Sequence, residues 1–377
     1  MAGGYTIAYN IPTLTGGEED YIRQAIRGRR YAGDGPWSRR CEEKLAEMLG
    51  GPRVLLTPSC TAALEMSALL LDFAPGDEVI MPSYTFVSSA NAFILRGAVA
   101  VFVDVDPRTM NIDPARVAAA VTPRTKAIMP VHYAGVGCDM DALMEIAKKA
   151  GAAVVEDAAQ GVAAHYKGRP LGTIGDLGCI SFHESKNLQC GEGGALVINR
   201  PDLRERAEIL REKGTNRARF LRGEVDKYTW TDIGSSYLAN EMTAAFLLAQ
   251  LEGGEAITAR RLEIWRRYKA GLANSGFELP GVPAECGHNA HIFWIKTRDE
   301  NERDALIDYL RAEGIQAPFH YVPLHSTAPG RRTGRFVGND CYTTSDSGRL
   351  LRLPLHGTLK EEEQERVIEA LLRFNAR

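Results

Sequence analysis

The chain has 377 residues, a formal net charge of -3, 45% apolar residues and 25% charged residues. This length favours two domains, and the composition is that of an ordinary soluble globular protein. The slightly acidic balance argues against a nucleic-acid surface, which needs a strongly basic one. No apolar run approaches the roughly 18 residues of a membrane helix. The start, "MAGGYTIAYNIPTL", lacks the basic and apolar regions of a signal peptide.

Seven cysteines are scattered along the sequence without a CxxC pair. An odd and irregular set of this kind is typical of free thiols in a reducing compartment. It indicates neither a disulfide framework nor a zinc site. We therefore expect a cytoplasmic protein without a metal site.

From about residue 40 to 200, helical patterns alternate with short β-branched runs. The expected helices of this region are 41–50, 61–73 and 139–151. The expected strands are 53–57, 77–81, 99–105, 126–132, 152–157, 177–182 and 194–199. Strands that alternate with helices predict a mostly parallel sheet that is covered on both faces.

After residue 200 the pattern changes to long charged helices followed by an α+β tail. The expected elements here are helices over 202–214, 239–276 and 302–314 and a strand over 291–297. The change places a domain boundary near residue 250. We expect an α/β protein with a large domain, residues 1–250, and a smaller C-terminal α+β domain, residues 251–377.

Ligands of a doubly wound sheet bind beyond the carboxyl ends of its strands, and three stretches of this chain fall there. In "LLTPSCTAALEM", a strand turns at Pro58 into a helix that opens at Ser59, Cys60 or Thr61. The free N–H groups and the dipole of such a helix start can bind a phosphate, although serine and threonine are also ordinary helix caps. No GxGxxG follows the strand and no GxxxxGK[ST] occurs, so the nucleotide-binding fingerprints are missing.

The second stretch, "AAVVEDAAQG", is an apolar strand that ends in Glu156 and Asp157. Consecutive strand residues point to opposite faces, so one carboxylate can face a cleft while the other faces away. A buried carboxylate needs a charged or strongly hydrogen-bonding partner. No cluster of His, Asp and Glu with ligand spacing surrounds it, which argues against a metal. By itself this stretch fits either a ligand contact or a structural ion pair.

The third stretch, "SFHESKN", places Lys186 on a tight loop between two strands, just before the glycine-rich "CGEGGALVI". Most loop lysines are solvated surface charges. A lysine that is desolvated near a positive centre has a lowered pKa and can form a Schiff base. The combination of stretches favours this second interpretation. Pyridoxal phosphate needs an anion site, an acid for its ring nitrogen, such a lysine, and a flat face, which the aromatic loop "PSYTFVSS" can supply.

Together these stretches resemble the DegT/DnrJ/EryC1/StrS family of sugar aminotransferases, which have the fold type I architecture of pyridoxal-phosphate enzymes. The landmarks are "SCTAALEMSAL", "MPSYTFVSSANA", "VEDAAQG", "SFHESKN", "GEGGAL" and "HYVPLH", and they cover nearly the whole chain. "FHESKN", "REKGTNR", "VDKYTW" and "DIGSSYL" are similar to dTDP-4-keto-6-deoxyglucose 4-aminotransferases, which make 4-amino-4,6-dideoxy-galactose or -glucose. The resemblance implies this reaction, with L-glutamate as amino donor, in a homodimer with active sites at the subunit interface.

The resemblance also implies the cofactor contacts. Lys186 forms the Schiff base and shuttles the proton, and Asp157 pairs with the ring nitrogen. Gln160 hydrogen-bonds the phenolic oxygen of the ring, and Phe86 stacks on the ring. The phosphate is held by Cys60, Thr61 and Ser181.

Five further positions are implied to face the substrate or the partner subunit. His183 lies near the lysine and orients the ring or the substrate. Ser236 in "GSSYLAN" stands where the family usually has the asparagine that reaches the cofactor phosphate of the partner, and a serine can donate the same hydrogen bond. The sugar or its nucleotide phosphates contact His320, Tyr321 and His325 of "HYVPLH".

Two alternatives remain open. One is another pyridoxal enzyme on the same scaffold, such as an aminotransferase for a different nucleotide-linked ketosugar. Sugar 3-dehydratases of the family carry histidine where Lys186 stands, which argues against that branch. The other is a cofactor-free regulator or scaffold, because a fold alone does not determine function. The complete set Asp157, Gln160 and Lys186 argues against it.

Overall fold

The computed structural model describes residues 5–375. Its central feature is a sheet of eight strands in the order β1-β9-β8-β5-β4-β2-β3-β12. The strands are β1 (Arg53–Thr57), β2 (Glu78–Pro82), β3 (Val99–Val103), β4 (Thr125–Ile128), β5 (Ala153–Asp157), β8 (Leu177–Ser181), β9 (Gly194–Ile198) and β12 (Gly334–Phe336). Only β9 runs against the others, because it pairs antiparallel with both β1 and β8. The predicted mostly parallel sheet is confirmed.

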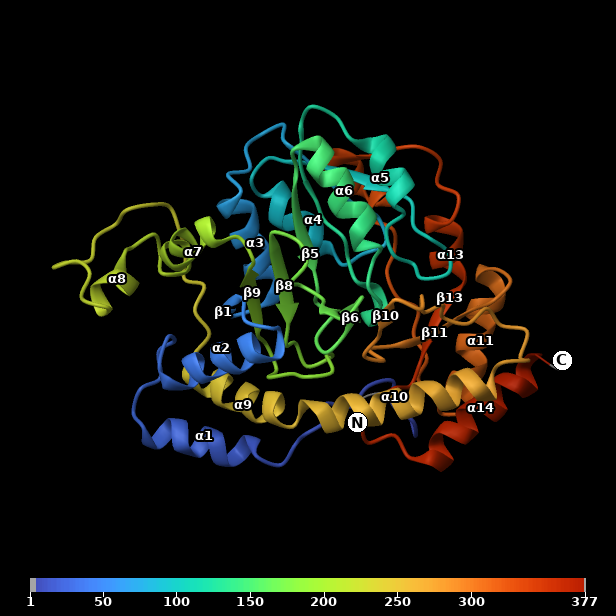
Figure 1. The fold of residues 1–377 in the computed structure, drawn as a ribbon. Helices are drawn as coiled ribbons and strands as arrows, with labels where there is room; N and C mark the ends of the chain where they lie inside the picture. Colours follow the sequence, from blue (N-terminus) through green and yellow to red (C-terminus); the bar gives the residue numbers. More distant parts are fainter. Residues whose placement is uncertain (1–4, 376–377) are drawn as a thin grey trace.

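Helices cover both faces of this sheet (Figure 1). Those before residue 253 are α1 (Glu18–Arg27), α2 (Pro36–Met48), α3 (Cys60–Leu70), α4 (Val87–Ile94), α5 (Pro114–Ala120), α6 (Met140–Ala150), α7 (Arg204–Arg211), α8 (Arg217–Leu221) and α9 (Glu241–Glu252). Val79 and Met81 of β2 pack in one core with α3 and α4, whereas Ile80 packs in another with α5 and α6. Alternate residues of the strands therefore bury two opposite faces.

The C-terminal part has its own core, formed around Tyr268, Phe293 and Leu306. Its helices are α10 (Gly254–Gly271), α11 (Glu300–Ala312), α12 (Ala328–Thr333), α13 (Thr343–Arg349) and α14 (Glu361–Asn375). Strands β11 (Phe293–Lys296) and β13 (Leu350–Leu353) pair with each other, and β10 (Cys286–Gly287) joins β6 (His165–Tyr166) and β7 (Arg169–Pro170). Ile7 packs in this core and β12 joins the large sheet, so both ends of the chain cross between the two parts. We keep the division into residues 1–250 and 251–377 as a proposal.

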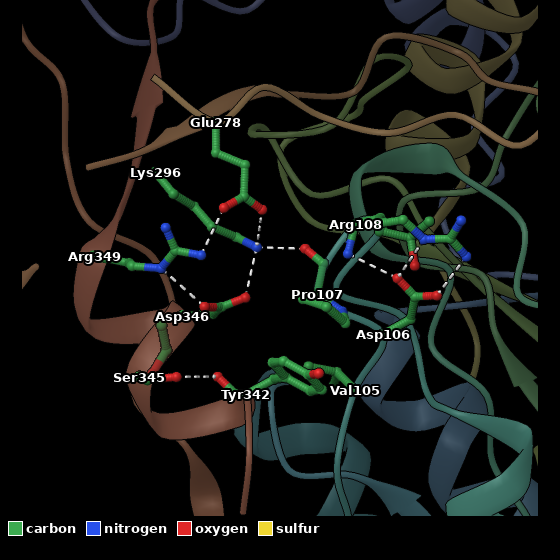
Figure 2. A network of polar contacts seen from close by, with 12 residues as sticks. Val105, Asp106, Pro107, Arg108, Glu278, Lys296, Tyr342, Ser345, Asp346 and Arg349 are labelled. Carbon is green, nitrogen blue, oxygen red and sulfur yellow. Dashed lines mark hydrogen bonds and ion pairs between the residues drawn. The ribbon is translucent and has the colours of Figure 1, made fainter. Parts of the chain in front are cut away.

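A buried ion network joins the C-terminal part to the segment after β3 (Figure 2). Lys296 at the end of β11 is buried and donates to Asp346 of α13 (2.6 Å) and to Glu278 (3.0 Å). It also donates to the carbonyl of Pro107, which follows β3. Arg349 donates to both carboxylates. Buried charges must be paired, so this network holds α13 and the start of β13 in one position against the large sheet.

Two predicted helices differ from the observed ones. The stretch 239–276 forms two helices, α9 and α10, that meet at Gly253. A Cβ at this glycine would lie 2.5 Å from Thr15 Cγ2, so the glycine lets the N-terminal segment pack against the junction. The stretch 202–214 ends as α7 at Arg211, because Lys213 and Gly214 have φ angles of 63° and 78°, which a helix does not accommodate.

Candidate active site

The loop between β8 and β9 carries Lys186 at the carboxyl end of the sheet. The loop is a tight turn in which the Lys186 N–H donates to the carbonyl of His183 (2.9 Å). Burial lowers the pKa of the Lys186 amine, and the charge of the neighbouring Asp157 opposes this effect without cancelling it. More of the amine is therefore in the neutral, nucleophilic form than in a surface lysine.

Asp157 and Glu156 at the end of β5 point to opposite faces. Asp157 accepts from Ser89 Oγ of α4 (2.7 Å) and from the backbone N–H two residues further on (3.1 Å). Glu156 is bonded to His132 Nε2 (2.9 Å) and accepts from three backbone N–H groups. Burial raises the pKa of Glu156, but these hydrogen bonds outweigh it and the pKa is lowered. Glu156 is thus a structural carboxylate, and Asp157 is the one whose charge acts on Lys186.

Gln160 and Lys186 line the same small cavity, together with Ala159 and Ser181. Gln160 Oε1 accepts from the N–H of Ala134 (2.7 Å), and its Nε2 donates to the Tyr321 hydroxyl (3.1 Å). In this structure the two bonds orient the amide at the edge of the cavity. The fold therefore brings Gln160 and Lys186 together.

The start of α3 offers free hydrogen-bond donors beside these groups. Ser59 caps the helix by accepting from the N–H of Ala62 (3.1 Å). Within residues 5–375, nothing accepts a hydrogen bond from the N–H of Cys60 or Thr61. Burial and the nearby Asp157 raise the pKa of the Cys60 thiol, so the thiol is neutral. A neutral helix start with open N–H groups suits a phosphate.

Aromatic side chains border the site. Phe86, which directly precedes α4, is 56% exposed, and its ring centroid lies 6.3 Å from that of Tyr321. Tyr321 in turn stacks on His320 at 3.6 Å. His320 Nδ1 is hydrogen-bonded to the Tyr133 hydroxyl (2.8 Å), and burial holds the pKa of His320 well below its ordinary value. An exposed phenylalanine next to a packed aromatic cluster can cover a flat ligand ring.

Two predicted site residues have other partners. His325 is bonded through Nδ1 to Ser83 Oγ (2.8 Å), and its Nε2 lies 3.2 Å from Asp340. His183 is partly exposed, and its Nε2 lies 3.7 Å from Glu192. In the part of the chain described, neither histidine side chain forms a hydrogen bond or ion pair with the side chain of Lys186 or Asp157. Both lie in the predicted loops, but their side chains turn elsewhere.

The fold also brings in residues that the sequence patterns did not indicate. Asn187, Asn289 and His291 line the cavity of Lys186. The only available signal was that Asn187 follows the lysine directly. The other two belong to "GHNAHIFW", which shows an ordinary strand pattern.

Arg352 of β13 is a further unpredicted residue. Its guanidinium donates to the Tyr9 hydroxyl (2.9 Å) and to the carbonyl of Phe319 (2.8 Å). It is close enough to lower the pKa of both Lys186 and His320. Over residues 5–375 no carboxylate pairs with it, so it is a cation without a counter-charge near the cavity.

Among the described residues, no three His, Cys, Asp or Glu side chains are placed to hold a metal ion. No helix in residues 5–375 is long and apolar enough to cross a membrane.

These side chains fit pyridoxal phosphate. Lys186 supplies an amine with a lowered pKa, Asp157 a buried carboxylate, and the start of α3 free N–H groups. A mostly parallel sheet with this set at its carboxyl ends defines a pyridoxal-phosphate-dependent enzyme of fold type I. The chain matches the DegT/DnrJ/EryC1/StrS aminotransferase family over residues 12–372 and belongs to it.

Individual relatives agree with this assignment. GDP-perosamine synthase from Caulobacter vibrioides is 34% identical over 371 residues, which are 97% of this chain and 97% of that protein. The aminotransferase TlmJ from Streptoalloteichus hindustanus has a TM-score of 0.91 at 34% identity, over 98% of this chain and 99% of that one. Spr1654 from Streptococcus pneumoniae, solved in its PLP form, has a TM-score of 0.89 at 26% identity, over 99% of both chains. The chain is therefore a pyridoxal-phosphate-dependent sugar aminotransferase, and the predicted fold, cofactor and reaction class are confirmed.

Proposed function

We propose that this aminotransferase moves the amino group of L-glutamate to C4 of a nucleotide-linked 4-keto-6-deoxy sugar, dTDP-4-keto-6-deoxy-D-glucose. The observation that carries the proposal is the grouping of Lys186, Asp157 and Gln160 in a chain of a sugar aminotransferase family. The sugar and the thymidine nucleotide rest on the motifs "FHESKN", "VDKYTW" and "DIGSSYL". The name of the relative GDP-perosamine synthase favours guanosine as a second candidate nucleotide.

Lys186 and Asp157 carry the proposed proton transfer. Pyridoxal phosphate, when bound, supplies an electron sink for the charge left on the α-carbon of the donor. Lys186 Nζ takes the proton from that carbon and later delivers a proton to C4 of the sugar. Burial favours the neutral amine that the first of these steps needs. Asp157 stabilises the protonated ring nitrogen, since its charge is buried and held in place by Ser89.

The remaining cofactor contacts are proposed from the sequence resemblance and the positions described above. Gln160 Nε2 would turn from Tyr321 toward the phenolic oxygen, and Phe86 would cover the ring. The phosphate contacts are assigned to Cys60, Thr61 and Ser181.

The two ends of the substrate site are proposed from charge and packing. The carboxylates of L-glutamate need a cation. We propose Arg352 for this contact, because it lacks a counter-charge near the cavity. His320 and Tyr321 remain the proposed sugar contacts, because both border the exposed Phe86 side. His325 has both ring nitrogens engaged, so we now assign it to support of the loop instead of the sugar.

Purified protein with pyridoxal phosphate and L-glutamate is expected to aminate dTDP-4-keto-6-deoxy-D-glucose at C4. We expect kcat/KM to exceed that of the GDP-linked sugar by on the order of tenfold or more. NMR of the product reports the position of the nitrogen and whether the amino group is axial or equatorial. A faster GDP-linked reaction would replace thymidine by guanosine, and no amino sugar from either would contradict the proposed substrate class.

We propose that the enzyme is a homodimer in which the segment around α8 reaches the partner subunit. This segment projects from the body of the molecule (Figure 1). Its exposed apolar side chains are Phe220, Leu221, Tyr228, Trp230 and Ile233, and Trp230 is 78% exposed. A group of exposed apolar side chains is typical of a protein interface. Ser236 is exposed where the segment returns to the body, which supports its proposed contact with the cofactor phosphate of the partner.

Mixing two inactive variants tests this arrangement. Lys186→Ala removes the lysine of one subunit, and Ser236→Arg blocks the site of the partner. In a mixed dimer, one site has an intact lysine and an intact serine. We expect random mixing after mild denaturation to restore about one quarter of wild-type activity, because about half of the dimers are mixed and each has one working site. Activity equal to the sum of the separate variants would contradict the shared site.

A further inference from the structure

The cavity beside Lys186 contains a buried histidine that none of the roles above uses. His291 lies two residues before β11 and lines this cavity with Lys186 and Asn187. It comes from the C-terminal part of the chain, whereas the lysine loop belongs to the large sheet. The cavity is thus closed by a titratable ring from a distant segment.

The backbone of His291 is held firmly in place. Buried Arg261 of α10 donates to the carbonyls of Ala290 (3.1 Å) and His291 (2.5 Å). Ala290 has a φ of 52°, a left-handed conformation that costs free energy in a residue other than glycine. Such a conformation persists only where surrounding contacts impose it. A buried arginine and a strained alanine therefore hold the backbone that carries this ring in one position.

Hydrogen bonds also determine which nitrogen of the ring carries the proton. Asn187 Nδ2 donates to the carbonyl of Asn289 (2.9 Å), so its Oδ1 faces His291 Nδ1 (2.9 Å) and accepts. Nδ1 must then be protonated, which leaves Nε2 with a free lone pair. Burial and the nearby Lys186 hold the pKa of His291 well below its ordinary value, so the ring stays neutral. Within residues 5–375, no group donates to Nε2.

We propose that His291 is a positioning residue for Lys186. Its Nε2 accepts a hydrogen bond from the Lys186 amine through one water in the cavity that both residues line, and so directs the lone pair of the amine toward the carbon atoms between which it moves protons. The ring itself gains and loses no proton, because the proton taken by Lys186 stays on Nζ until it is delivered. This inference rests on the proposed function, since it matters only if Lys186 moves protons.

Two substitutions at His291 distinguish the role of Nδ1 from that of Nε2. His291→Asn keeps a donor near the Nδ1 position for Asn187 but has nothing at the Nε2 position. His291→Gln places an amide at the Nε2 position and loses the Nδ1 donor. In single-turnover reactions with L-glutamate, we expect the rate constant of the Asn variant to fall about tenfold to a hundredfold, since misplacement of a reacting group lowers the rate. The L-glutamate concentration that gives half of the maximal rate constant should be unchanged. The Gln variant should stay within about fivefold of wild type. The reverse order would assign His291 to structural support of Asn187, and equal rates would also overturn the proposal.

A measurement on the cofactor-free protein tests the same point without activity. In ¹⁵N NMR of histidine-labelled protein, we expect His291 to be the Nδ1–H tautomer at neutral pH. Its Nε2 signal should shift in Lys186→Met, which removes the donor. An Nε2–H tautomer, or an Nε2 signal that ignores Lys186→Met, would overturn the proposal even if a variant at position 291 fails to fold. If the cofactor-loaded wild-type protein failed to react with L-glutamate, the proposed function itself would be contradicted. This outcome differs from both outcomes for His291, so the two failures can be told apart.

Discussion

Lys186→Ala is expected to abolish turnover and the yellow absorbance of the cofactor-bound protein while leaving the protein folded. The loss should be at least about 10³-fold in kcat, because the variant lacks the group that moves the proton. Folding should survive, because burial lowers the pKa of this amine and no ion pair to it is lost. Absorbance spectra, circular dichroism and steady-state rates measure the three effects.

The matched control is Lys167→Ala. Lys167 also lies in a turn, but its side chain is exposed and paired with Asp141. This variant should keep both the absorbance and the rate, since exposed ion pairs contribute little. Normal turnover by Lys186→Ala would remove the basis of the assignment.

Asp157→Asn is expected to lower the rate of the half-reaction with L-glutamate by about 10²- to 10³-fold, with a small effect on KM. The substitution keeps the shape of the side chain, and Ser89 can reverse its hydrogen bond because Thr85 Oγ1 lies 2.8 Å from Ser89 Oγ. Only the negative charge that we propose for the contact with the ring nitrogen is lost. Stopped-flow absorbance measures the rate, and we expect thermal unfolding to show a nearly unchanged stability.

Glu156→Gln is the opposite case, one residue away. The carboxylate of Glu156 accepts from three backbone N–H groups, and an amide NH₂ would face some of these donors. We expect the free energy of unfolding to fall by about 2 kcal/mol, with the folded fraction still active. If instead Glu156→Gln stopped the chemistry and Asp157→Asn only destabilised the protein, the two carboxylates would have to exchange roles.

Local patterns predicted much of the fold and indicated the residues of the proposed cofactor site. The apolar runs that became β1 to β5, β8 and β9 are continuous in sequence, and Asp157 at the end of β5 and Gln160 three residues further on lie in one short stretch. Lys186 could be located because its loop lies between two such strands. The local pattern alone could not decide which of Glu156 and Asp157 faces the lysine, because the answer depends on which helices cover each side of β5. Only the family resemblance pointed to Asp157.

Site residues from distant segments could not be predicted from the sequence either, because their positions also depend on how the elements pack. His291 and Arg352 approach Lys186 only because β11 and β13 pair beside the large sheet and a buried ion network holds them there. Neither position has a local signal, since histidine and arginine near strands are common. The close approach of Thr15 to Gly253 likewise joins segments that lie far apart in sequence.

Reduction with borohydride followed by peptide mass spectrometry tests the central claim most directly. Borohydride should fix the cofactor to the enzyme irreversibly, and the digest should show a phosphopyridoxyl group on the peptide that contains Lys186. An unlabelled peptide at this position, or a label on a different lysine, would contradict the account.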